Sequence, residues 1–299
     1  MDVDVVLKPH ALNGECPIWS AAEGVLYWSD TFEPALHRFD PRTGVDESWT
    51  MPATIGSFAL GAGDAALVAL RTGISRFDRR TARLDAFAPP PFDPHRMAWN
   101  DGKTDPLGRF WVGPMFAPLD RRGDGPKTAP LHLILPNGEQ VPKTAPVRIS
   151  NALAWSADGR TMYHADTVAQ EIGAYDVLDA ARGVLGERRT FARVAPPNGG
   201  PDGGATDTDG CYWSAVYAGS KVVRFRPDGR IEREVALPVP NVTMIAFGGA
   251  DLRTAYVTTA SRPLDAAQRD AQPLWGALFA FEAPAPGVPV PLLDGAYFK

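Results

Sequence analysis

Four polar residues stand at one repeated position of the chain. Each precedes, by roughly eight or nine residues, a glycine that opens a short apolar run with an aromatic; the four are Glu15, Asn100, Asn151 and Asp202. A repeated spacing indicates a repeated structural unit, and equivalent positions of units in a ring face one centre. Two carboxylates and two carboxamides would meet there, and oxygen is the donor that hard or borderline divalent cations bind. Each residue alone could be a turn or surface residue, so the shared position carries the metal hypothesis.

The pattern around these residues occurs six times. The copies begin at intervals of roughly 40 to 50 residues, the period of four-stranded propeller blades; their first residues are Gly24, Ala65, Gly108, Gly159, Gly210 and Arg253. Within each copy the runs are short, alternating and rich in Val, Ile, Tyr, Phe and Trp, which predicts strands. Asp-Gly, Asn-Gly and Thr-Gly pairs between them predict tight turns. We expect an all-β fold, a single six-bladed β-propeller domain over residues 1–299 with a central metal site.

The innermost strand of each blade is predicted by its small, weakly charged residues just before the glycine turn. The four polar residues then lie at one mouth of the channel. Ile55–Ser57 and Asn241–Thr243 stand at the matching places of the other two copies and would leave one side open to substrate and water. Because an open sheet exposes its edges, we expect residues 3–7 to pair with the last blade near 277–282.

Two segments between strands, 177–183 and 264–270, have brief helical character. No longer stretch has a helical period, and no Gly/Ser or Pro linker divides the chain. Both observations favour one all-β domain.

The composition is that of an ordinary soluble globular protein, with 44% hydrophobic and 22% charged residues. A net charge of -5 without a Lys/Arg stripe argues against nucleic acid, and no apolar run reaches the roughly 18 residues of a membrane span. No signal peptide is expected from the first residues. Cys16 and Cys211 are expected to be reduced thiols, with a disulfide as the alternative. We therefore expect a cytoplasmic monomer or small homo-oligomer.

Other residues with chemical potential have structural explanations. The sequence contains no G-x-S-x-G or H-E-x-x-H motif, no Cys/His cluster and no Gly-rich phosphate loop. Asp105 and Asp207 are expected to hold turns through hydrogen bonds. His164 is a weak candidate for a base, and His95 could line the channel mouth. Trp99 either points away from the centre or stacks on a sugar ring.

Five motifs follow one another in an order that is specific to one known family; they are G-E-C-P-I-W, N-D-G-K-T-D-P-L-G-R-F-W-V-G, S-N-A-L-A-W-S-A-D-G-R-T-M-Y-H-A-D-T, P-D-G-G-A-T-D-T-D-G-C-Y-W-S-A and P-N-V-T-M-I-A-F-G-G. Over nearly its whole length the chain resembles the SMP-30/gluconolactonase/luciferin-regenerating (regucalcin) family. The resemblance implies a six-bladed propeller with one catalytic divalent metal, held by Glu15, Asn151 and Asp202. It implies that Asn100 lies near metal and substrate and that Asp101 contacts a substrate hydroxyl.

The resemblance also implies the hydrolysis of a sugar lactone to its aldonic acid. A divalent cation in the channel would polarise the carbonyl, and Asp202 is the expected base. The donor set suits Ca²⁺, Mn²⁺ or Mg²⁺, and also admits Zn²⁺ or Fe²⁺. A related metal-dependent esterase or phosphotriesterase and a non-catalytic calcium-binding propeller are the alternatives.

Two departures from the family pattern lie on the substrate side. Ala98 stands where the family usually has a substrate-binding arginine, and Arg96, two residues earlier, is expected on the same side of the strand as a substitute. Gly113-Pro114-Met115 replaces the usual Gly-Thr-Met. We therefore expect lactone hydrolysis with an altered substrate preference.

Overall fold

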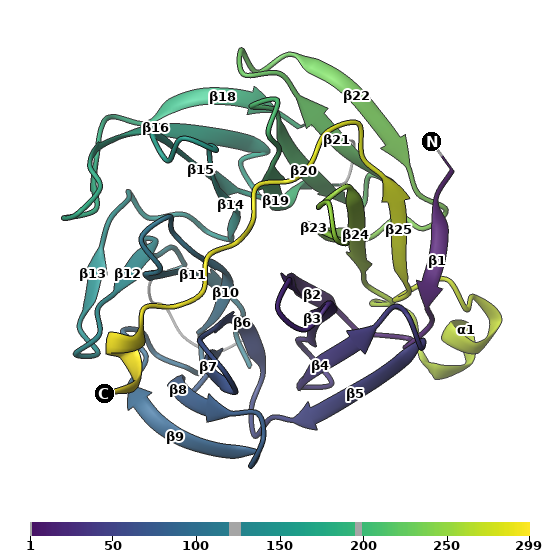
Figure 1. Cartoon of the computed structure of the whole chain (residues 1–299), viewed down its shortest axis with the longest axis horizontal. Coiled ribbons are helices and arrows are strands. Elements are labelled where there is room, and N and C mark those ends of the chain that lie inside the picture. The colour runs from purple at the N-terminus through teal and green to yellow at the C-terminus, as the bar shows by residue number, and fades with distance from the viewer. Residues whose placement is uncertain (1, 120–126, 195–198) are drawn as a thin grey trace.

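Six β-sheets stand radially around one channel in the computed structural model, which describes residues 2–119, 127–194 and 199–299 (Figure 1). The first three blades have four antiparallel strands each, running outward from the channel. Their bounds are β2 Gly14–Ser20, β3 Val25–Asp30, β4 Ala35–Asp40 and β5 Val45–Thr50 in blade 1; β6 Ile55–Leu60, β7 Ala65–Leu70, β8 Gly73–Asp78 and β9 Arg83–Ala88 in blade 2; β10 Met97–Thr104, β11 Phe110–Phe116, β12 His132–Ile134 and β13 Gln140–Pro142 in blade 3.

The other three blades complete the ring, and the N-terminal strand closes it. Their bounds are β14 Ser150–Trp155, β15 Thr161–Asp166, β16 Glu171–Asp179, β17 Val184–Leu185 and β18 Arg189–Arg193 in blade 4; β19 Gly200–Thr206, β20 Tyr212–Tyr217, β21 Lys221–Phe225 and β22 Ile231–Ala236 in blade 5; β23 Val242–Gly248, β24 Thr254–Thr259, β25 Leu278–Glu282 and β1 Asp4–Leu7 in blade 6. Asp4 pairs with Ala280, so the expected closure is confirmed.

Of the two segments with helical character, one forms a helix. A capping box at Asp265 and Gln268 starts α1, Ala266–Ala271. The other prediction is wrong: Val177–Asp179 extends β16, because Val177 pairs with Leu185 of β17. A short 3₁₀ helix, η1 Gly295–Phe298, was not expected. No helix among the described residues is long and apolar enough to cross a membrane.

Every inner strand carries one extra residue near its beginning. In β2, Glu15 pairs with Ser29 and Ile18 pairs with Tyr27 of β3. Two residues of β2 therefore lie between these pairs, where β3 has one. The same irregularity occurs in β6, β10, β14, β19 and β23. Such β-bulges bend a strand and re-aim its side chains, and they are common next to active sites.

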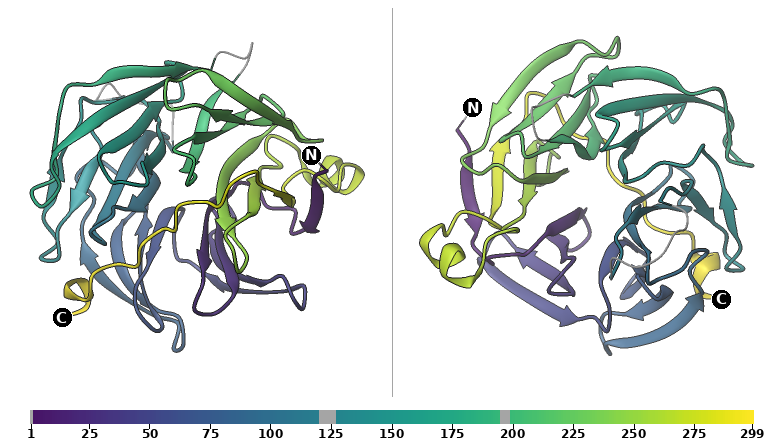
Figure 2. Two further views of the ribbon diagram at one scale, coloured as in Figure 1. Left: turned by 45° about the horizontal axis from the view of Figure 1, so that its top comes forward. Right: turned by 180° about the vertical axis from the view of Figure 1, so that it is seen from behind.

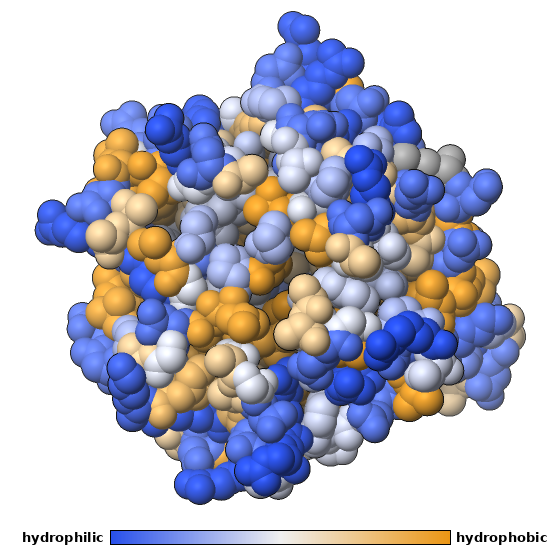
Figure 3. Space-filling view, viewed as in Figure 1, coloured by the Kyte–Doolittle hydropathy of each residue, from blue (hydrophilic) through white to orange (hydrophobic). Residues whose placement is uncertain are grey.

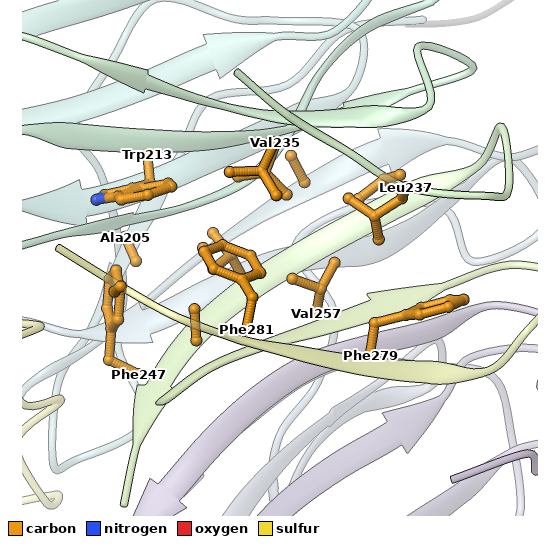
Figure 4. Close-up of a cluster of buried hydrophobic side chains, with 14 of the residues drawn as sticks. Ala205, Trp213, Val235, Leu237, Phe247, Val257, Phe279 and Phe281 are labelled. Atoms are coloured by element: carbon orange, nitrogen blue, oxygen red, sulfur yellow. The ribbon is translucent and has the colours of Figure 1, made fainter. Parts of the chain in front are cut away.

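Aromatic side chains fill the space between blades. Trp213 of blade 5 is fully buried and lies 5.9 Å from Phe247 and 5.8 Å from Phe281 of blade 6, measured between ring centroids (Figure 4). Trp111 of blade 3 contacts Trp155 of blade 4 at 5.7 Å. The cores thus lie between neighbouring sheets and fix the position of the inner strands. The expectation of reduced cysteines is confirmed, since Cys16 and Cys211 are buried and unpaired.

A C-terminal strap, residues 284–299, runs across one face of the ring (Figure 1). Its backbone donates from Val288 to Thr206, from Leu293 to Leu60 and from Asp294 to Gly108. These acceptors lie at or beyond the C-terminal ends of inner strands, so the strap marks the face opposite to the predicted site. Figure 2 shows the ring from the strap side and from behind.

Candidate metal and active site

The structure brings the four repeated residues together at one end of the channel. Glu15, Asn100, Asn151 and Asp202 each lie at or beside the bulge of an inner strand, near the end where that strand begins. The matching positions of the other two blades hold Gly56 and Thr243, as predicted. The end of the channel at which the inner strands begin lies on the face seen from behind in Figure 2, and we call it the mouth.

Carboxamides of neighbouring blades hold one another in place at the mouth. The amide Nδ2 of Asn100 donates to Ser150 O at 2.8 Å and to Asn151 Oδ1 at 3.0 Å. Asn151 Nδ2 donates to Thr167 Oγ1 at 2.8 Å. Asn13 Nδ2 donates to Glu15 Oε1 at 3.2 Å. The oxygen donors are therefore preorganised by side chains from several blades.

The two carboxylates of the predicted ligand set are electrostatically strained. Burial, and then the charges of Asp202 and Asp101, raise the pKa of Glu15 well above its ordinary value. Burial and the charge of Asp101 likewise raise the pKa of Asp202, although a hydrogen bond from Asn151 acts in the opposite direction. The causes show that three carboxylates share one buried space.

The charges of this space fit a divalent cation. Asp101 is 5% exposed and Lys103 is 7% exposed. Burial raises the pKa of Asp101, and the ammonium group of Lys103 acts in the opposite direction without cancelling this effect. Burial raises the pKa of each of the three carboxyl groups; with all three ionised, the one ammonium would leave two negative charges for a bound cation to balance. Carboxylate and carboxamide oxygens are also a suitable donor set for Ca²⁺, Mg²⁺ or Mn²⁺. No cluster of three His, Cys, Asp or Glu placed around one metal position occurs in the described ranges.

The predicted substrate residues occupy different positions. Arg96 precedes β10, so it is not on the strand as expected; its guanidinium lies 5.7 Å from the centre of the Phe116 ring. Asp101 accepts a hydrogen bond from Leu153 N at 2.8 Å and is buried beside the ligand carboxylates. Trp99 is fully buried and packs edge-on against Phe92 and His132, so it does not stack on a ligand at the mouth.

Ala98 and Pro114, the two departures from the family pattern, are buried strand positions, and Pro114 pairs with Trp99. Ala98 is fully buried and pairs with Met115. A Cβ at Gly113 would lie 1.8 Å from Ser150 Oγ. The side chain of Ser150 therefore requires glycine at this point, and no arginine side chain emerges from position 98.

Asp105 and Asp207 hold turns through hydrogen bonds, as predicted, and the weak base candidate His164 is also structural. Asp105 accepts from the backbone N of Leu107 and Arg109 and from Trp111 Nε1. Asp207 repeats the arrangement in blade 5, where it accepts from Trp213 Nε1 at 2.8 Å. His164 is buried against Ser150, and burial lowers its pKa to about 3. A neutral, enclosed imidazole is not positioned as a base at the mouth.

Sequence reasoning missed several groups around the site. Asn13 precedes an inner strand, Thr167 follows the second strand of blade 4, and Tyr217 ends the second strand of blade 5. Burial and the charges of Asp202 and Glu15 raise the pKa of Tyr217, so its hydroxyl stays protonated. Thr167 and Tyr217 share one place in the repeat, because each directly follows the residue that pairs with the position before Asn151 or Asp202. Their residue types differ, so this shared position was overlooked.

A second opening lies on the strap face. A cavity of about 1070 Å³ is lined there by blades 1, 2 and 6 and by Val288–Leu292, and Figure 3 shows hydrophobic side chains around a central hollow on this face. Trp19 lines this cavity and stacks on Tyr256. None of the four repeated residues lines it. Lys103 does, so it stands between the cavity and Asp101.

Comparison with known proteins decides the family. The family model of the SMP-30/Gluconolactonase/LRE-like region matches residues 13–261. The chain belongs to this family. A 6-deoxy-6-sulfogluconolactonase from Pseudomonas putida is 39% identical over 97% of this chain and 98% of its own length. Regucalcin from Xenopus laevis is 32% identical over 93% of each chain.

The fold of the family is also seen in solved structures. A calcium-binding regucalcin from Agrobacterium tumefaciens superimposes with a TM-score of 0.86 at 27% identity, covering 97% of this chain and 96% of that one. The six-bladed architecture predicted from the SMP-30/gluconolactonase motifs is therefore confirmed.

Proposed function

We propose that this chain is a divalent-metal-dependent lactonase that opens a sugar lactone to the corresponding aldonic acid. The observation that carries the proposal is the group of three buried, mutually interacting carboxyl groups beside carboxamide oxygens at the mouth. Membership of the SMP-30/gluconolactonase family supports the reaction, and the name of the Pseudomonas relative supports a sugar lactone as substrate. Two free, buried cysteines fit the reducing cytoplasm, where we place the protein as a monomer or small homo-oligomer.

Glu15, Asn151 and Asp202 would hold the cation. When bound, the cation would polarise the lactone carbonyl and stabilise the negative charge that develops on its oxygen. The Asp202 carboxylate takes a proton from the attacking water and returns it to the ring oxygen as the C–O bond breaks. Water is thereby added across the ester bond, and the products are a hydroxyl and a carboxylic acid on one chain.

Neighbouring residues position the reactants. Asn100 orients the substrate or water while its amide keeps Asn151 in place. Asp101 contacts a substrate hydroxyl or acts through the charge that it adds beside Asp202. Arg96 lies at the rim, where it can reach a substrate larger than the channel. The protonated Tyr217 can donate a hydrogen bond to the bound lactone.

A metal-exchange assay tests this function. Metal-stripped protein is assayed on sugar lactones and on phosphotriesters, alone and after addition of Ca²⁺, Mn²⁺ or Zn²⁺. We expect lactone opening only with a cation, and a drop of about 10²–10⁴ in kcat for Asp202→Asn. Asp228→Asn, in an exposed turn of blade 5, is the matched control.

Each alternative gives a different result in the same assay. Faster turnover of phosphotriesters would indicate the related hydrolase. Cation binding without any turnover would indicate a binding protein, which the calcium-binding description of the Agrobacterium relative favours. Near-normal lactone turnover by Asp202→Asn would show that the base is another group.

A further inference from the structure

Arg262 is a positioned cation at the mouth. It follows β24, and its guanidinium lies 4.0 Å from the centre of the Phe32 ring. Its backbone N donates to Leu12 O at 3.2 Å, and its O accepts from Asn241 Nδ2 at 2.6 Å. Phe32 is held in turn, because its N donates to Asp30 Oδ1 at 3.0 Å. The side chain is exposed, yet both its base and the ring beneath it are fixed.

Arg262 acts on the same hydroxyl group as the predicted metal ligands. The charges of Asp202 and Glu15 raise the pKa of Tyr217, whereas the charge of Arg262 lowers it. Loops 31–34 and 260–277 both lie on the mouth side, since each follows a strand that runs back from the strap face. The guanidinium therefore belongs to the surroundings of the site and is not a remote surface charge.

No carboxylate neutralises this guanidinium within residues 2–119, 127–194 and 199–299. Across the rim, Arg148 lies 5.4 Å from the centre of the Phe116 ring, and it too has no ion pair with a described residue. The chain as a whole has a net charge of -5, whereas the unpaired arginines make the surface around the mouth locally positive. Positive charge around a cleft attracts anions.

The chemistry of arginine indicates what would bind. A guanidinium presents a planar set of donors that matches a carboxylate, phosphate or sulfonate group. Stacking on Phe32 leaves the in-plane N–H groups free to donate. A neutral sugar lactone offers only hydroxyl groups, which do not require a fixed, unpaired cation.

We propose that Arg262 is a specificity-determining residue that binds an anionic substituent of the lactone, away from the carbonyl that reacts. The proposal rests on the proposed lactonase function and narrows its substrate class to lactones that carry a negative charge. The purely structural alternative is that Arg262 only covers Phe32 with its side chain.

Matched substrates test the proposal. The cation-loaded enzyme is assayed on gluconolactone and on gluconolactones that carry a phosphate or a sulfonate at carbon 6. We expect the wild type to prefer a charged lactone, with the phosphate and sulfonate compounds distinguishing the two anions. Arg262→Gln should lower kcat/KM for that lactone by about 10–100-fold, mainly through KM, because a hydrogen bond to a charged group is lost. Turnover of neutral gluconolactone should change less than about twofold.

Controls separate recognition from folding. Arg226→Gln removes an exposed arginine on the strap face and should leave both substrates unaffected, whereas Arg262→Lys should retain part of the preference. Equal losses on charged and neutral lactones in Arg262→Gln, or no preference in the wild type, would overturn the proposal. If no lactone reacts at all, the lactonase function fails. Calorimetric binding of 6-phosphogluconate to wild type and Arg262→Gln then tests the arginine independently, since equal affinities would reject it.

Discussion

Glu15 and Asp202 are held close to each other by the bulges of their strands, and this closeness has a consequence that depends on pH. Their folded pKa values are raised above the ordinary carboxyl range by burial and by neighbouring carboxylates. A carboxyl group whose pKa is higher in the folded protein than in the unfolded chain contributes to stability at pH values below its pKa in the unfolded chain. This contribution is lost as the pH rises through the pKa of the group in the folded protein. The cation-free protein is therefore destabilised at neutral and alkaline pH.

Removal of one carboxylate should reverse this effect. We expect cation-free Glu15→Gln to melt at a higher temperature than the cation-free wild type at pH 8, with the difference vanishing below about pH 4. The same variant should lose the rise in Tm that Ca²⁺ gives the wild type. Thermal melts across pH, with and without Ca²⁺, measure both effects. Glu282→Gln, exposed on the outer part of blade 6, is the control, and a Glu15→Gln variant that is destabilised equally at every pH would contradict the argument.

The sequence revealed those site residues that share one position in the repeat. Glu15, Asn100, Asn151 and Asp202 could be found because each blade begins its inner strand in the same way. Tyr217 was not found in this manner, although it holds the same place in the repeat as Thr167, because the two residues differ in type. Arg96 was misplaced because the strand starts one residue later than expected. The bulges set the final direction of the site side chains on the inner strands, and no residue pattern predicted the bulges.

At the scale of elements, the C-terminal strap was the largest surprise. Tyr297 is fully buried, and its hydroxyl donates to Ile134 O at 2.5 Å and accepts from Phe110 N at 3.2 Å. Arg76 also donates to Tyr297 O at 2.6 Å. The strap is poor in strand-forming alternation, so its docking depends on these tertiary contacts and could not be predicted from local pattern.

Tyr297→Phe should loosen the strap. Loss of the hydroxyl leaves two buried backbone groups without this partner, which costs about 1–3 kcal/mol. Denaturant unfolding measures the change in the free energy of unfolding. Tyr256→Phe is a matched control, because the hydroxyl of the buried Tyr256 has no hydrogen bond to a described residue, and it should change stability by less than about 0.5 kcal/mol. Equal effects of the two substitutions would show that the Tyr297 hydrogen bonds do not hold the strap.

At the scale of the whole molecule, the protonation of two buried histidines makes the free energy of unfolding depend on pH. Burial lowers the pKa of His132 to about 4 and that of His164 to about 3, and the two lie in neighbouring blades. Both are neutral when folded, whereas an unfolded chain protonates histidine near pH 6.5. The unfolded state thus binds more protons below that pH, so stability falls as the pH drops from about 6.5 toward 4.

Each of the two histidines should add up to about 1.4 kcal/mol per pH unit to this slope. We expect His132→Leu to reduce the slope measured by denaturant unfolding between pH 6.5 and pH 4. His95→Asn, at an exposed position, should leave the slope unchanged. An unchanged slope in His132→Leu would show that the folded protein protonates this imidazole.

The architecture was the part most completely predicted from sequence. The six copies, their period and the closure by residues 3–7 depend on patterns that every blade repeats, and the pairing of β1 with β25 confirms them. The short helical pattern at 177–183 misled because pairing with β17 outweighed local preference. β17 follows β16 within a few residues, so even a local strand pairing can override helical preference.

The position of the last residues has a practical consequence for handling the protein. Arg76 holds the end of the chain through Tyr297 O, at the edge of the face crossed by residues 284–299 (Figure 1). A resin, electrode or fusion partner joined after Lys299 would therefore attach at the edge of the strap face. The mouth, with Arg148 and Arg262 beside it, would point outward into solution. This orientation suits immobilisation in a flow reactor.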